Sequence, residues 1–254
     1  MKEEEFLREI SILESRFTNE LLSRMHNRQT PELFEALDPQ IERMGIDQDI
    51  INTFRIGYIP HRPTSLLKGI RSGVLSRAGV ARWEERWIFP LSRRIVIPIT
   101  NVYGNTVAFS GRRTGEDEES PKYINSPEHE WFKKCEILYG LAYALDFIRK
   151  NRRVFIVEGY SDVWLMRKSG YPETVAACGT SLTEYHVHLL RLLGVLVYLM
   201  FDGDQAGHKA DEAAQGMCRT FMVRFESLTG LLPEGDDPAS YLLRGGRFTN
   251  VLPI

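Results

Sequence analysis

Several features that would classify a chain quickly are scarce or missing in these 254 residues. The three cysteines, Cys135, Cys178 and Cys218, lie far apart and form no C-x-x-C pair, which argues against a disulfide framework and an internal zinc ribbon. No apolar run approaches the roughly 20 residues that a membrane-spanning helix needs. The first residues, MKEEEFLREI, are acidic and polar, unlike a signal or transit peptide. We therefore expect a cytoplasmic protein with no membrane partner.

Two phosphate-binding motifs are absent as well. The sequence contains no G-x-x-x-x-G-K-[ST] loop and no G-x-G-x-x-G segment after a predicted strand, so ATPase and dinucleotide-binding functions lack support. The remaining composition, 43% hydrophobic and 26% charged, is that of an ordinary globular protein. This length is sufficient for one large domain or two smaller ones.

Charge is spread unevenly along the chain. Residues 1–54 carry 6 Lys and Arg against 12 Asp and Glu, residues 55–153 carry 18 against 10, and residues 154–254 carry 8 against 12. A basic middle between acidic ends suggests a polyanion-binding surface beside an acidic site. A random fluctuation on solvated faces would give the same counts, so charge alone does not decide.

The first 150 residues predict a mixture of helices and strands. Apolar spacing predicts an amphipathic helix over residues 4–27, and Thr30-Pro31 is expected to open a second, short helix. Asp47 is a possible cap for a third helix. RRIVIPITNVYGNTVAFSGRR predicts a β-hairpin that turns at residues 103–105. EDEES is expected to be an exposed loop, and CEILYGLAYALDFIRK has helical periodicity.

From residue 153 the pattern changes to strands alternating with helices. Four short apolar runs, RVFIVEG, TVAACG, VLVYLMFDGD and SLTGLLPEG, are separated by helical segments near residues 161–169, 183–193 and 205–225. Near-continuous Val, Ile and Leu is typical of strands that are covered on both faces. This half of the chain therefore predicts an α/β fold, a doubly wound unit with a mostly parallel sheet.

Acidic residues follow three of these four runs. Glu158 ends the first, with Asp162 in the next helical turn; Asp202 and Asp204 end the third; and Asp237 follows the last. Ligands of open parallel sheets bind at the carboxyl ends of the strands, so we expect these carboxylates to lie along one edge. A cluster of like charges is unfavourable without cations, and Mg²⁺ prefers such oxygen ligands. The neighbouring glycines would let backbone and metal-bound phosphate approach closely.

Each acidic residue also has a purely structural interpretation. Asp204 could cap the following helix, Asp162 could complement a helix dipole, and Asp237 with Pro238 could simply start a helix. We interpret Cys178 as a small core residue beside a tight turn, because no histidine is paired with it in the sequence. His186 and His188 are two residues apart on a predicted helix, and we interpret both as structural.

At this point the motifs are recognisable. VEGYSDV, ACGTSLT and FDGDQAG, in this order, resemble the TOPRIM domain of DnaG-type primases, topoisomerases and some nucleases. FRIGYIP, the predicted hairpin and SPKYINSPEHEWFKKCEILYG resemble the amino-terminal subdomain of bacterial DnaG-type primase catalytic cores. The resemblance covers about residues 43 to 245. It implies a smaller mixed α+β basic subdomain (43–150) and a TOPRIM catalytic domain (151–254), and the apolar periodicity places an N-terminal helical segment (1–42) before them.

The resemblance implies a primase-type nucleotidyltransferase, which makes short RNA primers from ribonucleoside triphosphates on single-stranded DNA during replication. Glu158, Asp202 and Asp204 would then be the principal ligands of Mg²⁺ or Mn²⁺, supported by Asp162 and Asp237. In the family, basic residues face this site and contact phosphates. The matching positions here are Arg94, Arg112, Lys122, Asn125 and Lys134.

Three departures from the family pattern affect this interpretation. The family often has a second acid where this chain has Ala239, which predicts a weaker metal site near Asp237. The zinc-binding domain expected before the core and the helicase-binding domain expected after it are not seen in the sequence. We therefore expect no zinc in this chain, and a zinc-binding module and a helicase as possible partners. The sequence would then be either the catalytic core of a longer primase or a minimal primase whose zinc module is a separate polypeptide, as in a phage or compact replicon. Alternatives are a TOPRIM nuclease or strand-passage component and a non-catalytic nucleic-acid-binding module.

Overall fold

The computed structural model describes residues 1–26, 41–114, 120–179, 181–246 and 248. The chain forms two compact units, Met1–Lys133 and Lys134–Ile254. The boundary that the sequence suggested at residue 150 falls inside the second unit, because the segment just before it packs with the second sheet. The helix expected at Thr30-Pro31 and most of the acidic loop EDEES lie outside the described residues.

The first unit is built on a four-stranded antiparallel sheet with the strand order β1-β4-β5-β6. A separate two-stranded hairpin, β2–β3, follows two short helices. The elements are α1 (Glu3–His26), α3 (Gln48–Phe54), β1 (Gly57–Ile59), α4 (Thr64–Leu67), α5 (Ser72–Arg77), β2 (Arg82–Glu84), β3 (Arg86–Ile88), β4 (Arg94–Thr100), β5 (Thr106–Arg113) and β6 (Tyr123–Asn125).

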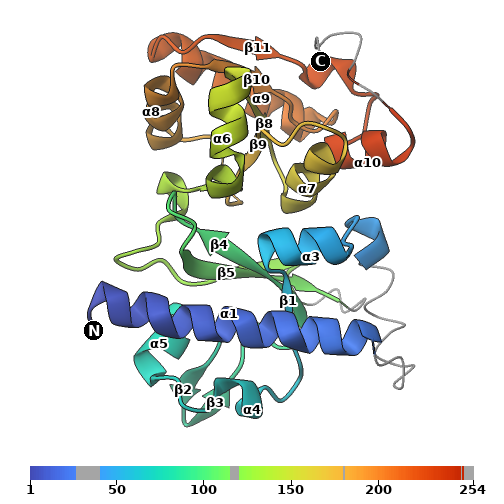
Figure 1. Ribbon diagram of the computed structural model, residues 1–254. Coiled ribbons are helices and arrows are strands. Elements are labelled where there is room, and N and C mark those ends of the chain that lie inside the picture. Colours follow the sequence, from blue (N-terminus) through green and yellow to red (C-terminus); the bar gives the residue numbers. More distant parts are fainter. Residues whose placement is uncertain (27–40, 115–119, 180, 247, 249–254) are drawn as a thin grey trace. The chain divides into compact units, whose positions relative to one another are not determined.

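Helix α1 is the long amphipathic helix that the sequence predicts, and it packs along the sheet (Figure 1). Its apolar residues recur every three or four positions and are almost fully buried: Phe6, Ile10, Leu13, Phe17 and Leu21. The helix approaches β1 so closely that a Cβ atom at Gly57 would lie 2.6 Å from the backbone carbonyl carbon of Phe17. Glycine at this position therefore allows the helix and the sheet to meet.

Two further sequence predictions for this unit are confirmed. Strands β4 and β5 pair along almost their whole length and form the predicted hairpin. Asp47 caps α3, and its Oδ1 accepts a hydrogen bond of 2.9 Å from the backbone N–H of Ile50. The helix ends at Phe54, followed by Arg55 with a left-handed backbone (φ 57°), so the chain turns into β1 before Pro60.

The second unit contains a five-stranded sheet with the order β11-β10-β8-β9-β7, parallel except for β7. Its elements are the 3₁₀ turn η1 (Lys134–Glu136), β7 (Leu138–Tyr139), α6 (Leu141–Asn151), β8 (Arg153–Val157), α7 (Tyr160–Lys168), β9 (Thr174–Ala177), α8 (Glu184–Leu193), β10 (Leu196–Leu199), α9 (Gln205–Thr220), β11 (Phe225–Ser227), the 3₁₀ turn η2 (Thr229–Leu231) and α10 (Pro238–Leu243). The predicted α/β class with a mostly parallel sheet is confirmed.

Both faces of this sheet are covered, which explains its nearly continuous apolar strands. On one face, Val154 and Ile156 of β8 join a core cluster to which α6, α8 and α9 contribute. Phe155 points to the other face, where its ring stacks on Tyr198 of β10 with the centroids 5.1 Å apart. Successive side chains of a strand alternate between faces, so apolar residues at every position indicate two buried faces.

Two details of this unit were predicted wrongly. SLTGLLPEG was expected to be the fourth strand, but β11 is Phe225–Ser227, and Thr229–Leu231 forms a 3₁₀ turn. The segment 135–150 was expected to be helical, but it contains η1 and β7 before α6 begins at Leu141. Among the described residues, no helix combines the length and the apolarity needed to cross a membrane.

Candidate acidic site at the sheet edge

The carboxyl ends of β8 and β10 lie side by side, because these two strands are parallel neighbours in the sheet. Glu158 follows β8, and Asp202 follows β10. The backbone N–H of Asp202 donates a hydrogen bond of 3.1 Å to Oε1 of Glu158. The structure therefore brings together the first two acidic residues that the sequence selected.

The loop after Asp202 is held against the loop before α10. The N–H of Gly203 donates to the carbonyl of Asp236 (2.7 Å), and the N–H of Gly235 donates to the carbonyl of Gly203 (3.2 Å). A Cβ atom at Gly203 would lie 2.5 Å from the carbonyl oxygen of Pro233, so a side chain there would push the loops apart. This contact brings the Asp237 segment beside the end of β10.

Asp162 lies in the first turn of α7 and is buried. Its Oδ2 accepts a hydrogen bond of 2.8 Å from the N–H of Gly159, which stabilises the start of the helix. The pKa of Asp162 is raised to about 7, mainly by burial and next by the Asp237 carboxylate, with the N–H groups of Gly159 and Ala239 acting in the opposite direction. Asp162 therefore both caps a helix and adds negative potential to the site.

Asp204 and Asp237 occupy helix N-caps. Asp204 accepts a hydrogen bond of 2.7 Å from the N–H of Gly207 at the start of α9. Asp237 accepts from the N–H of Ser240 (2.5 Å) and from its hydroxyl (3.0 Å) at the start of α10. The prediction that both residues cap helices is thus confirmed. The cap bond of Asp204 uses Oδ1 and leaves Oδ2 for coordination, whereas both oxygens of Asp237 accept hydrogen bonds from Ser240.

The strongest electrostatic anomaly of the site is at Asp202. Its pKa is raised to about 8, first by burial and then by the carboxylates of Glu158, Asp162, Asp237 and Asp204, in that order. Its Oδ1 is buried and has no hydrogen-bond partner. Burial also raises the pKa of Glu158, with Asp204 adding to the shift and the Asp202 N–H opposing it. A buried carboxylate oxygen without a partner is costly unless a cation binds it.

The carboxylates are not gathered tightly enough to form a finished metal centre. Among the described residues, no group of three or more His, Cys, Asp or Glu side chains has the spacing of a metal site. Four of the five candidates accept a hydrogen bond from a backbone N–H group: Glu158, Asp162, Asp204 and Asp237. Glu158 and Asp202 nevertheless offer hard oxygen donors at one edge, including the unpartnered Oδ1, which suits a divalent cation such as Mg²⁺.

The candidate phosphate-binding residues differ greatly in exposure. Arg94 is 4% exposed, and its guanidinium donates to the carbonyls of Gly111 (3.1 Å) and Pro121 (2.9 Å). Arg112 is 6% exposed, and it donates to the Tyr123 hydroxyl (2.7 Å). The guanidinium groups of these two arginines therefore hold the sheet and its following loop together.

The other three candidates are more accessible. Lys122 is exposed just before β6, Asn125 is half-buried in β6, and Lys134 is half-buried at the start of η1. Asn125 pairs through its backbone with Ser110 of β5. Lys134 belongs to the second unit, whereas the other four candidates belong to the first.

The residues that the sequence suggested to be structural have structural surroundings. Cys178 is buried, and burial raises the pKa of its thiol to about 12, so the thiolate needed for a nucleophile is disfavoured. His186 is buried, and its Nδ1 accepts a hydrogen bond of 3.2 Å from the N–H of Thr183, the cap of α8. The ring of His188 contacts the ring of Phe221, with the centroids 4.6 Å apart.

Sequence reasoning passed over the segment between Thr64 and Phe89, which contains two exposed tryptophans beside a pocket. The signal was present in ARWEERWIF, where Trp83 and Trp87 alternate with charged residues. Exposed tryptophans are unusual on a globular surface, and this spacing could have marked a possible binding surface.

Two family models match the chain. The DNA primase catalytic core, N-terminal domain, matches residues 21–145, and the Toprim domain matches residues 152–226. Among curated proteins, the DNA primase of Chlamydia pneumoniae is 38% identical over 221 residues, covering 85% of this chain and 36% of the relative. The chain thus spans about a third of the length of the curated relatives that it matches.

Solved structures agree with these matches. The Aquifex aeolicus primase, solved with its zinc-binding and RNA polymerase domains, has a TM-score of 0.83 and 30% identity, covering 97% of this chain and 59% of that one. The E. coli primase catalytic core has a TM-score of 0.78 and 30% identity, with coverages of 95% and 76%. A DnaG primase catalytic domain bound to single-stranded DNA has a TM-score of 0.79 and 29% identity, with coverages of 96% and 78%.

Proposed function

We propose that this chain, which belongs to the family of bacterial DnaG-type primase catalytic cores, synthesises short RNA primers on a single-stranded DNA template. The observation that carries the proposal is the pair formed by Glu158 and Asp202 at the ends of adjacent parallel strands. Together with the unpartnered Asp202 oxygen, this pair supports a site for a divalent cation. A related catalytic domain binds single-stranded DNA, which supports the choice of template.

The acidic residues divide into two roles. Glu158, Asp202 and Asp204 would bind Mg²⁺ or Mn²⁺, and Asp162 and Asp237 would support them by fixing the loops and adding negative potential. Bound divalent ions would supply charge neutralisation for the nucleotide phosphates and activation of the primer 3′-hydroxyl. Because Asp204 and Asp237 are caps, α9 and α10 would hold them in place. The second oxygen of Asp204 would face the cation, whereas both oxygens of Asp237 accept hydrogen bonds from Ser240, which suits a supporting role.

The basic candidates also divide into two roles. Lys122 is exposed, and it would contact phosphates of the template or of the growing hybrid directly, together with Asn125 and Lys134. Arg94 and Arg112 would act mainly as positioning residues, because their guanidinium groups already bind the carbonyls and the hydroxyl of their own unit. Ribonucleoside triphosphates would be the substrates.

Partners outside this chain would complete the reaction. A zinc-binding module and a replicative helicase would increase the local concentration of template at the site, which raises apparent affinity without new contacts. A solved relative carries a zinc-binding domain beside its RNA polymerase domain. A cytoplasmic location and a phage source stay predictions from the sequence.

The test is primer synthesis on single-stranded DNA with labelled ribonucleotides and Mg²⁺ or Mn²⁺. Asp202→Asn keeps the size of the side chain but removes its charge, so product should nearly disappear. Asp146→Asn is the matched control, because Asp146 lies on α6 with its side chain 95% exposed. Product from Asp202→Asn at the unsubstituted level would refute the metal-site assignment. Metal-dependent degradation of the template without RNA product would instead indicate a TOPRIM nuclease.

A further inference from the structure

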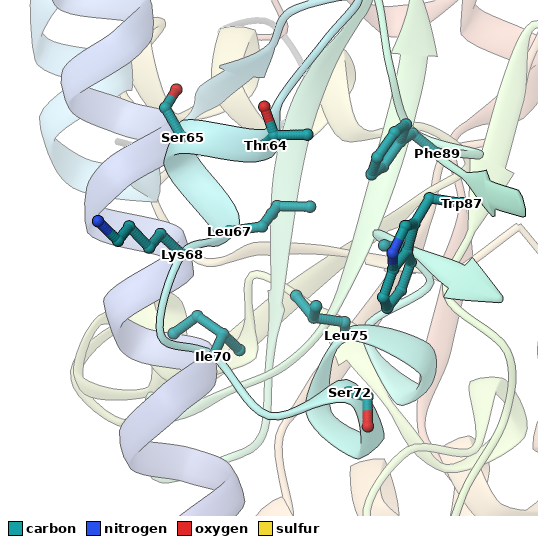
Figure 2. Close-up of a pocket in the computed structure, with 10 residues that line it drawn as sticks. Thr64, Ser65, Leu67, Lys68, Ile70, Ser72, Leu75, Trp87 and Phe89 are labelled. Atoms are coloured by element: carbon teal, nitrogen blue, oxygen red, sulfur yellow. The ribbon is translucent and has the colours of Figure 1, made fainter.

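The first unit contains a pocket of about 530 Å³ that the proposed acidic site does not use. It lies between the α4–α5 segment and the β2–β3 hairpin (Figure 2). This size is in the range of small-molecule sites, which are mostly apolar with a few polar groups. The pocket is lined by Thr64, Ser65, Leu67, Lys68, Ile70, Ser72, Leu75, Ala81, Trp87 and Phe89.

The pocket has two unlike walls. Figure 2 shows the rings of Trp87 and Phe89 on one side, and the aliphatic side chains of Leu67, Ile70 and Leu75 across from them. An aromatic wall facing an aliphatic wall suits a flat, apolar ring, because the ring can stack on one side and pack on the other. The hydroxyl groups of the lining serines and threonine could pair with polar edges of such a ring.

A second aromatic ring continues this surface outside the pocket. Trp83 pairs with Trp87 in the register of β2 and β3, and their ring centroids are 5.6 Å apart. The side chains are 64% and 45% exposed. Directly opposed residues of a hairpin project to the same face, and the two rings meet there edge to face, with an angle of 76° between their planes. They therefore offer two separate stacking faces. A ligand with a single ring would not cover both.

Three exposed cations lie on the segments that form the pocket: Lys68 lines it, Arg62 precedes α4, and Arg86 belongs to β3. Arg62, Lys68 and Arg86 are exposed, and none of them has an ion pair among the described residues. By contrast, Arg71 pairs with Glu5 and Glu9 of α1. The Lys68 side chain extends outward, away from the two rings (Figure 2), so its ammonium group is available outside the pocket rather than inside it.

We propose that this pocket binds one unpaired base of a single-stranded nucleic acid. The base would stack on Trp87, and the adjacent base would stack on Trp83. Phosphates that flank the two stacked bases would contact Arg62 and Arg86, and a phosphate at the opposite rim of the pocket would contact Lys68. A polymer fits better than a free nucleotide, because the second tryptophan and the three cations extend beyond the pocket. The choice of occupant rests on the proposed function, which requires a single-stranded template.

Trp87→Ala tests the proposal by fluorescence anisotropy of a labelled single strand, measured without ribonucleotides and without divalent metal. Affinity should fall by about fivefold to a hundredfold, the loss expected for one stacked base. Trp87→Phe should recover part of the loss because it restores a ring. Tyr103→Ala is the matched control, since Tyr103 is an 84% exposed aromatic residue in the β4–β5 turn. Equal affinity of Trp87→Ala and the unsubstituted chain would overturn the proposal.

An abasic strand of equal length separates stacking from charge. It keeps the phosphates and lacks the bases, so the unsubstituted chain and Trp87→Ala should bind it equally. Lys68→Ala should weaken both strands and lower the slope of log affinity against log salt by about 0.7, as for one phosphate contact. If Trp87→Ala weakens the intact and the abasic strand by the same factor, the base is not the ligand.

Competition identifies the occupant. A mononucleotide or polyglutamate should displace the strand only at far higher concentration than an unlabelled oligonucleotide. Displacement by either at equal concentration would overturn the proposal in favour of a free nucleotide or an acidic peptide. Because removing Trp87 also removes a contact with Trp83, the melting temperature of each variant is measured alongside its affinity. Trp83→Ala changes no residue that lines the pocket, and it should also weaken binding of the single strand.

The two proposals fail separately. Normal primer synthesis combined with unchanged DNA binding by Trp87→Ala would remove the base pocket and leave the proposed function. DNA binding that depends on Trp87, in a chain that makes no RNA, would support the base pocket and contradict the proposed function.

Discussion

The two compact units carry the same net charge but arrange it differently. Met1–Lys133 has 19 Lys and Arg against 20 Asp and Glu, and Lys134–Ile254 has 13 against 14, so each is net −1. In the first unit, acidic side chains of α1 pair with basic residues far along the chain. Glu14 pairs with Arg55 (3.1 Å), and Glu9 pairs with Arg71 (2.7 Å). Much of the charge contrast seen in the sequence is therefore cancelled by folding.

The second unit leaves like charges together. Glu158 and Asp202 meet at the sheet edge, and burial raises the pKa of both. Charges that stabilise a fold are paired, whereas unpaired buried charges persist mainly where a ligand needs them. The contrast teaches that the number of charges in a unit does not show where a binding surface lies. The pairing of charges is more informative, and it supports the proposal of a cation site in the second unit.

Removing one carboxylate of the acidic site should have the largest effect. Glu158→Gln keeps the oxygen that accepts from the Asp202 N–H but removes the negative charge. We expect primer synthesis to fall at least about a hundredfold, the upper range for disturbed metal sites, with little loss of stability. Synthesis is measured over a Mg²⁺ titration, with Glu184→Gln on the surface of α8 as the control. Unchanged synthesis would contradict a metal-binding role for the carboxylates of the second unit.

Breaking a pair in the first unit should cost stability instead. Glu14→Ala leaves Arg55 without its carboxylate and the buried Thr106 hydroxyl without its acceptor. We expect the free energy of unfolding to fall by about 2–3 kcal/mol. Denaturant titration measures it, with Glu4→Ala at an exposed position of α1 as the control. A loss no greater than that of the control would show that pairing in this unit is incidental.

The metal-free second unit should lose stability as pH rises. Folding raises the pKa of Asp162 to about 7 and of Asp202 to about 8, above the value of about 3.9 for an unfolded aspartate. The folded state therefore binds more protons, and its advantage is complete below pH 4 and lost as pH rises to 8.

Asp202→Asn should remove part of this dependence. In the presence of a chelator we expect it to stabilise the chain by about 1–2 kcal/mol at pH 8, after allowance for solvent screening. Thermal and denaturant unfolding at pH 5, 6, 7 and 8 measure the difference. A parallel pH profile for the variant and the unsubstituted chain would contradict the prediction.

Lys122, one of the exposed cations of the first unit, should give the smallest effect. Lys122→Ala should lower the salt slope of single-strand binding by about 0.7 and weaken affinity only modestly. Lys150→Ala, at the exposed end of α6, is the matched control. Identical salt slopes for the two variants would show that Lys122 is a solvated surface residue that contacts no phosphate. The same assay applied to Lys134→Ala tests the cation that belongs to the second unit.

The sequence predicts the elements whose apolar pattern is long and regular. Helix α1 and the β4–β5 hairpin follow from periodicity and turn residues. The edge strands β11 and β7 could not be predicted in this way. Strand β11 has a single neighbour and its residues Glu226 and Ser227 are exposed, so it lacks the apolar run of a central strand. Strand β7, two residues long, lies within a segment whose apolar content suggested a helix.

The acidic site was predictable because strand ends converge in a parallel sheet, and so Glu158 and Asp202 could be placed together from order alone. The burial of Arg94 and Arg112 was not predictable. Their partners are backbone carbonyls and a tyrosine of neighbouring strands and loops, and no periodicity in the sequence reports such contacts. The role of each site residue stays a prediction.

Helix α1 has a practical consequence for shortened versions of this protein. The primase family model starts at residue 21, after the segment that contains Phe6, Ile10, Leu13 and Phe17. A version trimmed to that boundary would expose the apolar groove beneath the helix and release the arginines that its glutamates neutralise. We expect such a protein to aggregate, or to purify with cellular nucleic acid attached, and so to give misleadingly high readings in any DNA-binding assay.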